Sequence, residues 1–213
     1  CKTPKNEWVF YRNCVISLVY DRLLNNQTKI SVREAEDMQR YKIVFGGAMG
    51  AGKSQAITSL SDIHVLATEA LNTDEHAHSK LLTTVGIDYG EIALDAETCI
   101  GLYGTPGQDR FSFIWPIIGE GALGIIILLD HSAANPVADL DMYINDFSKT
   151  STNLIIGITH VDMKPERPIS IYRDWLTARQ LLYPLFSIDA RVKDDVLLLV
   201  ETMIAKLEAE DAY

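Results

Sequence analysis

The amino-acid sequence predicts an α/β fold of three layers, in which a six-stranded, mostly parallel mixed sheet carries helices on both faces. From residue 41 onward, short apolar runs alternate with amphipathic stretches, which is typical of such a sheet. Residues 122–130 are almost wholly apolar and indicate a central strand buried on both faces. The 213 residues, 47% of them apolar, are enough for one sizeable core. We expect one domain over residues 41–213 and an N-terminal extension over residues 1–40.

The elements are expected in a regular order, beginning with a strand at residues 41–46 and a helix at residues 53–62. Residues 87–94 and 98–103 are two β-like runs joined by only three residues. So short a link forces an antiparallel hairpin, because a parallel crossover needs roughly a dozen residues or more. The later elements are the central strand, a helix at 136–148, a strand at 153–159, a helix at 170–179, a short strand at 183–187 and a terminal helix whose apolar face carries Val192, Val196, Val200, Met203 and Leu207.

Residues 1–40 stand outside this alternation. Trp8, Tyr11 and Val15 begin an apolar series at near-helical spacing, which predicts an amphipathic helix. Three placements stay open: packing on the domain, docking of a partner, or binding to a membrane surface. We favour packing on the domain, because so apolar a face is costly to leave in water.

Charge and cysteine content limit the function classes. The chain has 19 basic and 29 acidic residues, for a net charge of −10. An acidic body repels phosphate backbones at long range, so a nucleic-acid partner bound through a broad basic face is excluded. Three widely separated cysteines form no disulfide framework and no metal-binding pair, and no transmembrane run or signal peptide is visible. A cytoplasmic location is the natural expectation.

The strongest motif lies directly between the first strand and its helix. Residues 47–54 read Gly-Ala-Met-Gly-Ala-Gly-Lys-Ser and match the pattern G-x-x-x-x-G-K-[ST]. The glycines let successive backbone N–H groups point at a β-phosphate, and the helix N-terminus adds a favourable dipole. Lys53 then reaches the β- and γ-phosphates, and the Ser54 hydroxyl binds Mg²⁺. The nucleotide-binding residues predicted here are Gly47, Gly50, Ala51, Gly52, Lys53, Ser54 and Gln55.

Two further segments follow in an order that resembles the Ras-like small GTPases. Residues 83–89, Thr-Thr-Val-Gly-Ile-Asp-Tyr, are similar to the switch I threonine motif, and residues 103–111, Tyr-Gly-Thr-Pro-Gly-Gln-Asp-Arg-Phe, to the switch II motif D-x-x-G-Q. The resemblance implies that Thr84 binds Mg²⁺, that Gly107 donates its N–H to the γ-phosphate and that Gln108 orients the attacking water. It implies a P-loop NTPase fold, GTP or GDP as ligand and Mg²⁺ as cofactor. A plain strand start would also explain Thr84.

One position departs from the family pattern. Gly104 stands where the family has an aspartate that holds the second shell of Mg²⁺ through water. We therefore expect weaker Mg²⁺ binding and slow intrinsic hydrolysis. The amino-acid sequence of residues 103–111 is similar to that of the bacterial MglA-type polarity GTPases and closer still to that of the GTPases of actinobacterial conservon operons. Those relatives work with roadblock-type, MglB-like proteins, so a roadblock partner is implied by resemblance alone.

Base recognition is predicted at the end of the strand at residues 153–159. Residues 159–162, Thr-His-Val-Asp, resemble the guanine motif [NT]-K-x-D. An aspartate accepts two hydrogen bonds from guanine N1 and N2 and finds no such pair on adenine, so Asp162 is the expected specificity residue. Thr159 and His160 complete the motif. His160 replaces the usual lysine, and its ring could cover the face of the base.

A second contact to the base is expected further along the chain. Residues 187–191, Ser-Ile-Asp-Ala-Arg, stand where the family has its S-A-K loop. By that resemblance the Ala190 backbone N–H contacts the guanine oxygen, with Asp189 beside it.

The aromatic residues after Gln108 allow two interpretations. Phe111, Phe113, Ile114 and Trp115 make switch II unusually apolar. They are either ordinary core or a nucleotide-gated surface for a partner.

Together these patterns predict a GTP-binding molecular switch that hydrolyses GTP to GDP slowly and with Mg²⁺. The alternative is an interaction module that keeps its nucleotide with little or no turnover. Gly104 and His160 favour the module, whereas Gln108 favours hydrolysis. A P-loop ATPase or kinase is disfavoured, because the motifs fall in GTPase order.

Overall fold

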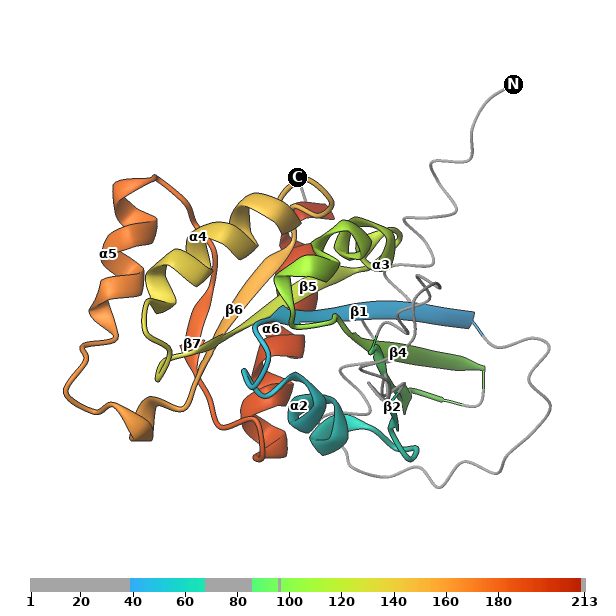
Figure 1. Ribbon diagram of the computed structural model, residues 1–213. Helices are drawn as coiled ribbons and strands as arrows, with labels where there is room; N and C mark the ends of the chain where they lie inside the picture. The colour runs from blue at the N-terminus through green and yellow to red at the C-terminus, as the bar shows by residue number, and fades with distance from the viewer. Residues whose placement is uncertain (1–38, 68–85, 96, 212–213) are drawn as a thin grey trace, which may run out of the picture.

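A seven-stranded sheet organises the computed structural model, with its strands in the order β2-β3-β4-β1-β5-β6-β7 (Figure 1). The structure describes residues 39–67, 86–95 and 97–211. The strands are β1 (Gln39–Gly47), β2 (Leu66–Ala67), β3 (Asp88–Ala93), β4 (Thr98–Gly104), β5 (Gly124–Asp130), β6 (Leu154–Thr159) and β7 (Leu185–Ser187). β4, β1, β5, β6 and β7 pair in parallel, whereas β2 and β3 are antiparallel to their neighbours. The predicted mixed, mostly parallel sheet is confirmed.

The sheet has one strand more than the six expected. β2 pairs antiparallel with β3 at the edge of the sheet, Leu66 opposite Tyr89 and Ala67 opposite Asp88. Both β2 residues are exposed, so no buried apolar alternation marks them in the sequence. Only backbone pairing with β3 makes them a strand, and the expectation of six strands was wrong by this edge.

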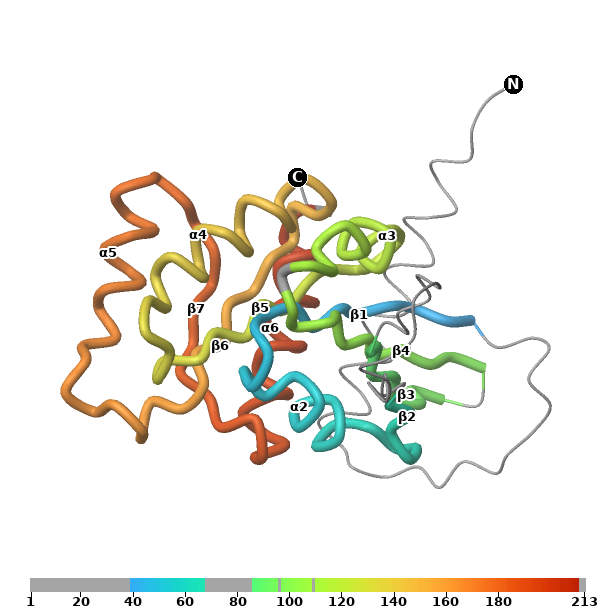
Figure 2. Tube along the Cα trace, viewed as in Figure 1, coloured from blue at the N-terminus to red at the C-terminus, as the bar shows by residue number. Residues whose placement is uncertain are grey.

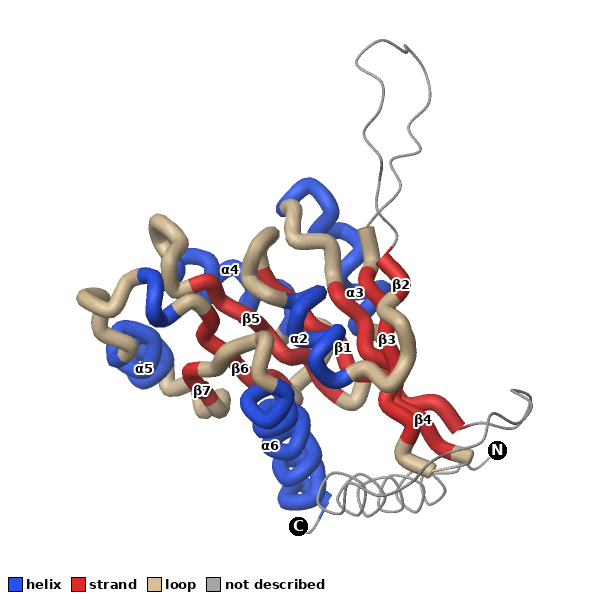
Figure 3. The backbone as a smooth tube through the Cα atoms, turned by 90° about the horizontal axis from the view of Figure 1, so that it is seen from below, coloured by secondary structure: helices blue, strands red, loops and turns tan. Residues whose placement is uncertain are grey.

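Helices cover both faces of the sheet, as predicted. They are α2 (Lys53–Leu60), α3 (Trp115–Gly119), α4 (Pro136–Phe147), α5 (Ser170–Ala178) and α6 (Lys193–Asp211), with short 3₁₀ turns η1 (Asp109–Ile114) and η2 (Val161–Met163). α2 and α6 share one apolar core, and α3, α4 and α5 share the other. Figure 1 shows α3 and α4 above the strands and α2 below them, and Figure 3 shows α2 and α6 side by side.

Strand alternation supplies both cores. On β1, Ile43 and Phe45 face the core under α2 and α6, while Val44 faces the core under α3, α4 and α5. Residues 124–129 of β5 are all buried, which confirms the predicted central strand. β1 lies in the middle of the sheet between β4 and β5, as the blue tube in Figure 2 shows. The loop that leaves β1 therefore starts from the buried end of a central strand.

The predicted hairpin and terminal helix are both present. The Asp95 carboxylate accepts hydrogen bonds from the backbone N–H groups of Glu97 and Thr98, at 2.7 and 2.8 Å, and this closes the turn between β3 and β4. In α6 the predicted positions Val196, Val200, Met203 and Leu207 are buried, and so are Leu199 and Ile204, which the prediction did not include. Val192 precedes the helix and is exposed, so that end of the predicted apolar series was wrong.

Several expectations fall outside the described residues: the N-terminal helix, Thr84 with the first three residues of the switch I segment (83–85), and the cysteines at positions 1 and 14. β1 begins at Gln39, two residues before the expected domain boundary at residue 41. Over the described ranges, the structure contains no helix with the length and apolarity needed to cross a bilayer.

Candidate functional site

The loop between β1 and α2, which is the predicted phosphate loop at residues 47–54, owes its path to glycine. Gly47, Gly50 and Gly52 have φ angles of 139°, 85° and 93°, which side-chain-bearing residues rarely adopt. At Gly47 there is also no room, since a Cβ atom would lie 2.2 Å from the carbonyl oxygen of Leu128. Gly52 precedes the first residue of α2. The loop thus wraps around the N-terminus of α2, where backbone N–H groups are unsatisfied within the helix.

Lys53 is folded back over this loop. Its ammonium group donates hydrogen bonds to the carbonyl oxygens of Gly47 and Ala48 at 2.8 and 2.7 Å, and the side chain is buried. Burial lowers the pKa of Lys53 to about 8, and the negative charge of Asp88 partly opposes that shift. One buried cation is therefore held where the loop wraps.

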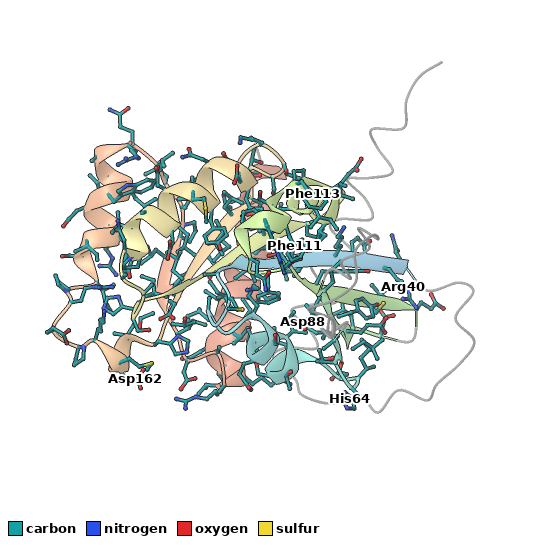
Figure 4. The ribbon with its side chains drawn as sticks, in the orientation of Figure 1. Arg40, His64, Asp88, Phe111, Phe113 and Asp162 are labelled. Atoms are coloured by element: carbon teal, nitrogen blue, oxygen red, sulfur yellow. The ribbon has the colours of Figure 1, made fainter. Side chains whose placement is uncertain are left out.

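Asp88 is the residue of this site that sequence reasoning missed. The Ser54 hydroxyl donates a hydrogen bond of 2.5 Å to Asp88 Oδ2. Asp88 is the first residue of β3 and lies directly opposite Gly104 on β4. Figure 4 shows it beside α2. The signal that could have found it is the predicted hairpin: counting back from the turn pairs residue 88 with Gly104, the position at which the sequence departs from the Ras-like pattern.

The segment after β4 lies against the phosphate loop. The backbone N–H of Met49 donates to the carbonyl oxygen of Gly107 at 3.0 Å. A Cβ atom on Gly107 would come within 2.4 Å of Met49 N, so this close approach requires glycine. Gln108 follows as the residue before η1, and its side chain is exposed. The structure thus brings Gly107 to the loop and leaves Gln108 at the surface.

The aromatic residues of this segment divide between core and surface. Trp115 is buried against Tyr143 and Phe147, and its indole N–H donates to the carbonyl oxygen of Pro106 at 3.1 Å. Phe111 is also buried, whereas Phe113 is 66% exposed. Figure 4 labels both phenylalanines. Ordinary core therefore explains Trp115 and Phe111 but not Phe113.

The predicted base-recognition residues surround one cavity of about 680 Å³. It lies next to the phosphate loop at the carboxyl ends of the parallel strands, which is where ligands bind in open α/β sheets. The lining residues include Gly52, Gln55, Thr159, His160, Asp162, Asp189, Ala190, Arg191 and Asp195. Figure 4 shows Asp162 at this end of the molecule, away from Asp88.

Thr159 joins the cavity to the phosphate loop. Its hydroxyl oxygen lies 3.1 Å from the carbonyl oxygens of both Ala51 and Leu129, and the side chain is buried. His160 follows in the left-handed conformation with φ 55°, and its Nδ1 lies 3.3 Å from Asp130 Oδ1. Asp162 is exposed on η2.

The loop after β7 is held by charged side chains. The backbone N–H of Asp189 donates to Asp195 Oδ2 at 2.8 Å, and the Asp189 carboxylate accepts from the Arg191 guanidinium at 2.6 to 3.1 Å. Arg191 lowers the pKa of Asp189 to about 2 through these hydrogen bonds. Ala190 lies between them and is buried. A Cβ atom on Gly52 would come within 3.0 Å of Ala190 Cβ, so the two loops pack closely.

Comparison with known proteins agrees with this geometry. The chain is 27% identical to the Ras-related protein Rab-18 of Lymnaea stagnalis over 124 residues, which is 57% of this chain and 55% of that protein. It is 24% identical to the GTP-binding protein yptV2 of Volvox carteri over 182 residues, 80% of this chain and 78% of that protein. It is 27% identical to the Ras-related protein Rab-3C of Mus musculus over 124 residues, 55% of each chain.

The chain is similar to Ras-related small GTPases. No family model matches it. It spans about half the length of Rab-18 and Rab-3C. The Ras-like resemblance drawn from the motifs is supported at the level of this broad group, and the sheet with helices on both faces is consistent with a P-loop GTPase fold.

Proposed function

We propose that the chain is a Mg²⁺-dependent GTP-binding switch that hydrolyses GTP slowly. The observation that carries this proposal is that the phosphate loop and the cavity adjoin each other. Gly52 belongs to the phosphate loop and also lines the cavity, together with Asp162. A nucleoside triphosphate has the same two-part chemistry, a polyanionic chain joined to a flat polar base. The likeness to Ras-related proteins supports guanine as that base.

At the phosphate end, the loop N–H groups and the Lys53 ammonium would bind the β- and γ-phosphates. Ser54 offers a hydroxyl oxygen, a hard donor that suits Mg²⁺, and its proton is donated to the Asp88 carboxylate at 2.5 Å. Bound Mg²⁺ would neutralise charge on the β- and γ-phosphates. Thr84 is proposed as a further ligand from switch I.

The hydrolytic role rests on Gln108 and Gly107. Gly107 already contacts the phosphate loop, which supports its proposed N–H donation to the γ-phosphate. Gln108 would orient the attacking water from the next position. The Gly104 replacement is the reason to propose slow turnover.

At the base end, Asp162 is proposed to accept hydrogen bonds from guanine, with His160 over the ring and the Ala190 N–H on the guanine oxygen. Titration of purified protein with fluorescent GDP, GTP and ATP tests this assignment. Tighter binding of both guanine nucleotides is expected, because adenine leaves the Asp162 carboxylate unpaired. Equal or tighter binding of ATP would contradict it.

The second candidate, a nucleotide-bound module without turnover, is favoured by one observation: Gln108 is exposed at the surface. A multiple-turnover phosphate-release assay separates the two. Following the resemblance of residues 103–111 to bacterial MglA-type proteins, the assay should include a roadblock-type protein as proposed partner. Release in either condition supports the switch, and no release in both supports the module.

A further inference from the structure

The carboxylate of Asp88 lies where the sequence lacks one at Gly104. We propose that Asp88 is the positioning residue for Mg²⁺: it orients the Ser54 hydroxyl oxygen toward the ion and accepts a hydrogen bond from a water molecule bound to that ion. This inference rests on the proposed nucleotide function and names the residue that completes its Mg²⁺ site.

The first argument is strand register. Asp88 and Gly104 are directly opposite in the antiparallel β3–β4 pair, so their side chains belong on the same face of the sheet. A Cβ atom built on Gly104 would lie 3.1 Å from both Asp88 Cβ and Asp88 Oδ2. The Asp88 side chain thus occupies the space that a residue-104 side chain would enter, and the carboxylate reaches the site from the neighbouring strand.

The second argument is the face on which Asp88 lies. Alternate residues of β3 point to opposite faces, so Asp88, Gly90 and Ile92 share one face. Ile92 is buried in the core with α2, and a Cβ atom on Gly90 would come within 2.8 Å of Ile57 on that helix. Asp88 continues this face toward the first turn of α2, where Ser54 meets it.

The third argument is the chemistry of the Ser54–Asp88 hydrogen bond. A serine hydroxyl that donates its proton keeps two oxygen lone pairs, so Ser54 can bind a cation while it donates to Asp88. A carboxylate has about four acceptor positions, so one donor leaves capacity for a metal-bound water. Partners of this kind orient metal ligands and raise their basicity, and their loss typically costs about 10- to 100-fold in metal affinity.

The same crowding explains why position 104 is glycine. A Cβ atom there would already lie 3.1 Å from Asp88 Cβ and Asp88 Oδ2, so an aspartate would have to share the space that the Asp88 side chain fills. It would also press on Ile57, whose Cδ1 lies 3.1 Å from the built Cβ position. Gly104 and Asp88 therefore form a matched pair, and Gly104→Asp alone should not strengthen Mg²⁺ binding.

The test is the release rate of fluorescent GDP, measured by stopped flow in excess Mg²⁺ and again in excess chelator. We expect the chelator to accelerate release from the wild-type chain strongly. In Asp88→Asn the acceleration should fall by about 10- to 100-fold, because release in Mg²⁺ becomes fast while release in chelator stays unchanged. Circular dichroism melting of both proteins confirms that the fold is kept.

Two further variants sharpen the result. The exchange Asp88→Gly with Gly104→Asp moves the carboxylate across the strand pair and should restore part of the lost Mg²⁺ dependence. The matched control is Glu91→Gln, which removes the same charge from β3 but faces the other side of the sheet, where Glu91 contacts Arg40 at 3.0 Å. It should leave the chelator effect unchanged.

The outcomes separate the inference from the proposed function. If wild type binds no guanine nucleotide, the proposed function fails and the inference falls with it. If wild type binds GDP but chelator does not accelerate release, or if Asp88→Asn keeps the full chelator effect, the inference is overturned. Asp88 then only packs against the N-terminal turn of α2. Slower release from Asp88→Asn in Mg²⁺ would also overturn it, because Asp88 would then act by repelling phosphate.

Discussion

The phosphate end and the base end of the site are built in different ways. The phosphate end consists of backbone in a fixed path, closed by buried Lys53 and by the approach of Gly107. The base end consists of side chains around a cavity, and two of its charged members, Asp162 and Arg191, are exposed. The phosphate end therefore depends on the conformation of the backbone, and the base end depends on the identity of the side chains that line its cavity.

This difference predicts how each end responds to substitution. The glycines of the phosphate end adopt backbone conformations that other residues rarely adopt, so a substitution there should affect folding and binding together. Exposed side chains bear little on stability, so a change at the base end should affect binding alone. The four predictions below test that contrast, from the largest expected effect to the smallest.

Gly47→Ala should have the largest effect. The new Cβ atom would overlap the Leu128 carbonyl oxygen in a backbone conformation that alanine rarely adopts. We expect a loss of roughly 2–5 kcal/mol in the free energy of unfolding, measured by urea denaturation, together with loss of nucleotide binding. Gly50→Ala is the matched control, since its Cβ has open space and only the positive φ of 85° costs energy, about 1–2 kcal/mol. Equal destabilisation by the two variants would contradict the close approach at residue 47.

Asp162→Ala should separate binding from stability. Removing a carboxylate that accepts two hydrogen bonds should weaken GDP and GTP binding by about 10- to 100-fold. The midpoint of urea unfolding should not move, because Asp162 is exposed on η2. Glu166→Ala removes an exposed acid four residues further along, outside the cavity lining, and should leave affinity unchanged. A weaker affinity in both variants would indicate a general charge effect instead.

His160 depends on both its side chain and its backbone conformation, because it lines the cavity and also has a left-handed backbone. His160→Asn keeps a residue that tolerates this conformation and removes only the ring, so we expect a loss of about 2- to 10-fold in GDP affinity at unchanged stability. His160→Ala adds the conformational cost and should also lower the unfolding midpoint. Fluorescent-nucleotide titration and urea denaturation distinguish them, and identical behaviour of Asn and Ala variants would count against the backbone argument.

Arg191→Ala should have the smallest effect and is best seen as a pKa change. Without the guanidinium, the pKa of Asp189 should rise from about 2 toward its ordinary value of 3.8, measured by NMR titration of the carboxyl carbon. Because the folded-state pKa is depressed, the pair's contribution to stability is present above pH 3.8 and is lost as the pH falls toward 2. The pair is solvent-exposed, so no measurable change in stability is expected at neutral pH.

A control at Lys193 completes this prediction. Lys193→Ala removes an exposed charge two residues further along and should leave the pKa of Asp189 near 2. If both variants raise it equally, the cause is the net charge of the loop and not the direct hydrogen bonds.

Sequence reasoning succeeded where a pattern is local. The glycine-rich segment was placed correctly between a strand and a helix, because glycines and a lysine at fixed spacing mark such a loop, and buried strands such as β5 need an unbroken apolar run. The hairpin was predictable because three residues leave only one way to turn, and Asp95 closes it as expected of a turn residue. Each of these depends on neighbours within a few positions.

The failures share the opposite property. β2 is two exposed residues that become a strand only beside β3. The burial of Trp115 depends on where Tyr143 and Phe147 of α4 lie, which the apolar run alone does not specify.

The sequence by itself therefore determined the glycine-rich loop between β1 and α2 and the alternation of strands and helices, and it supplied the predicted phosphate-binding and base-recognition positions. Only the tertiary structure placed Asp88 against Ser54, 34 residues earlier in the chain, and in the space above Gly104. The physical reason is strand register: a missing side chain on one strand can be supplied by the residue opposite it, and which residue is opposite is settled when the strands pair.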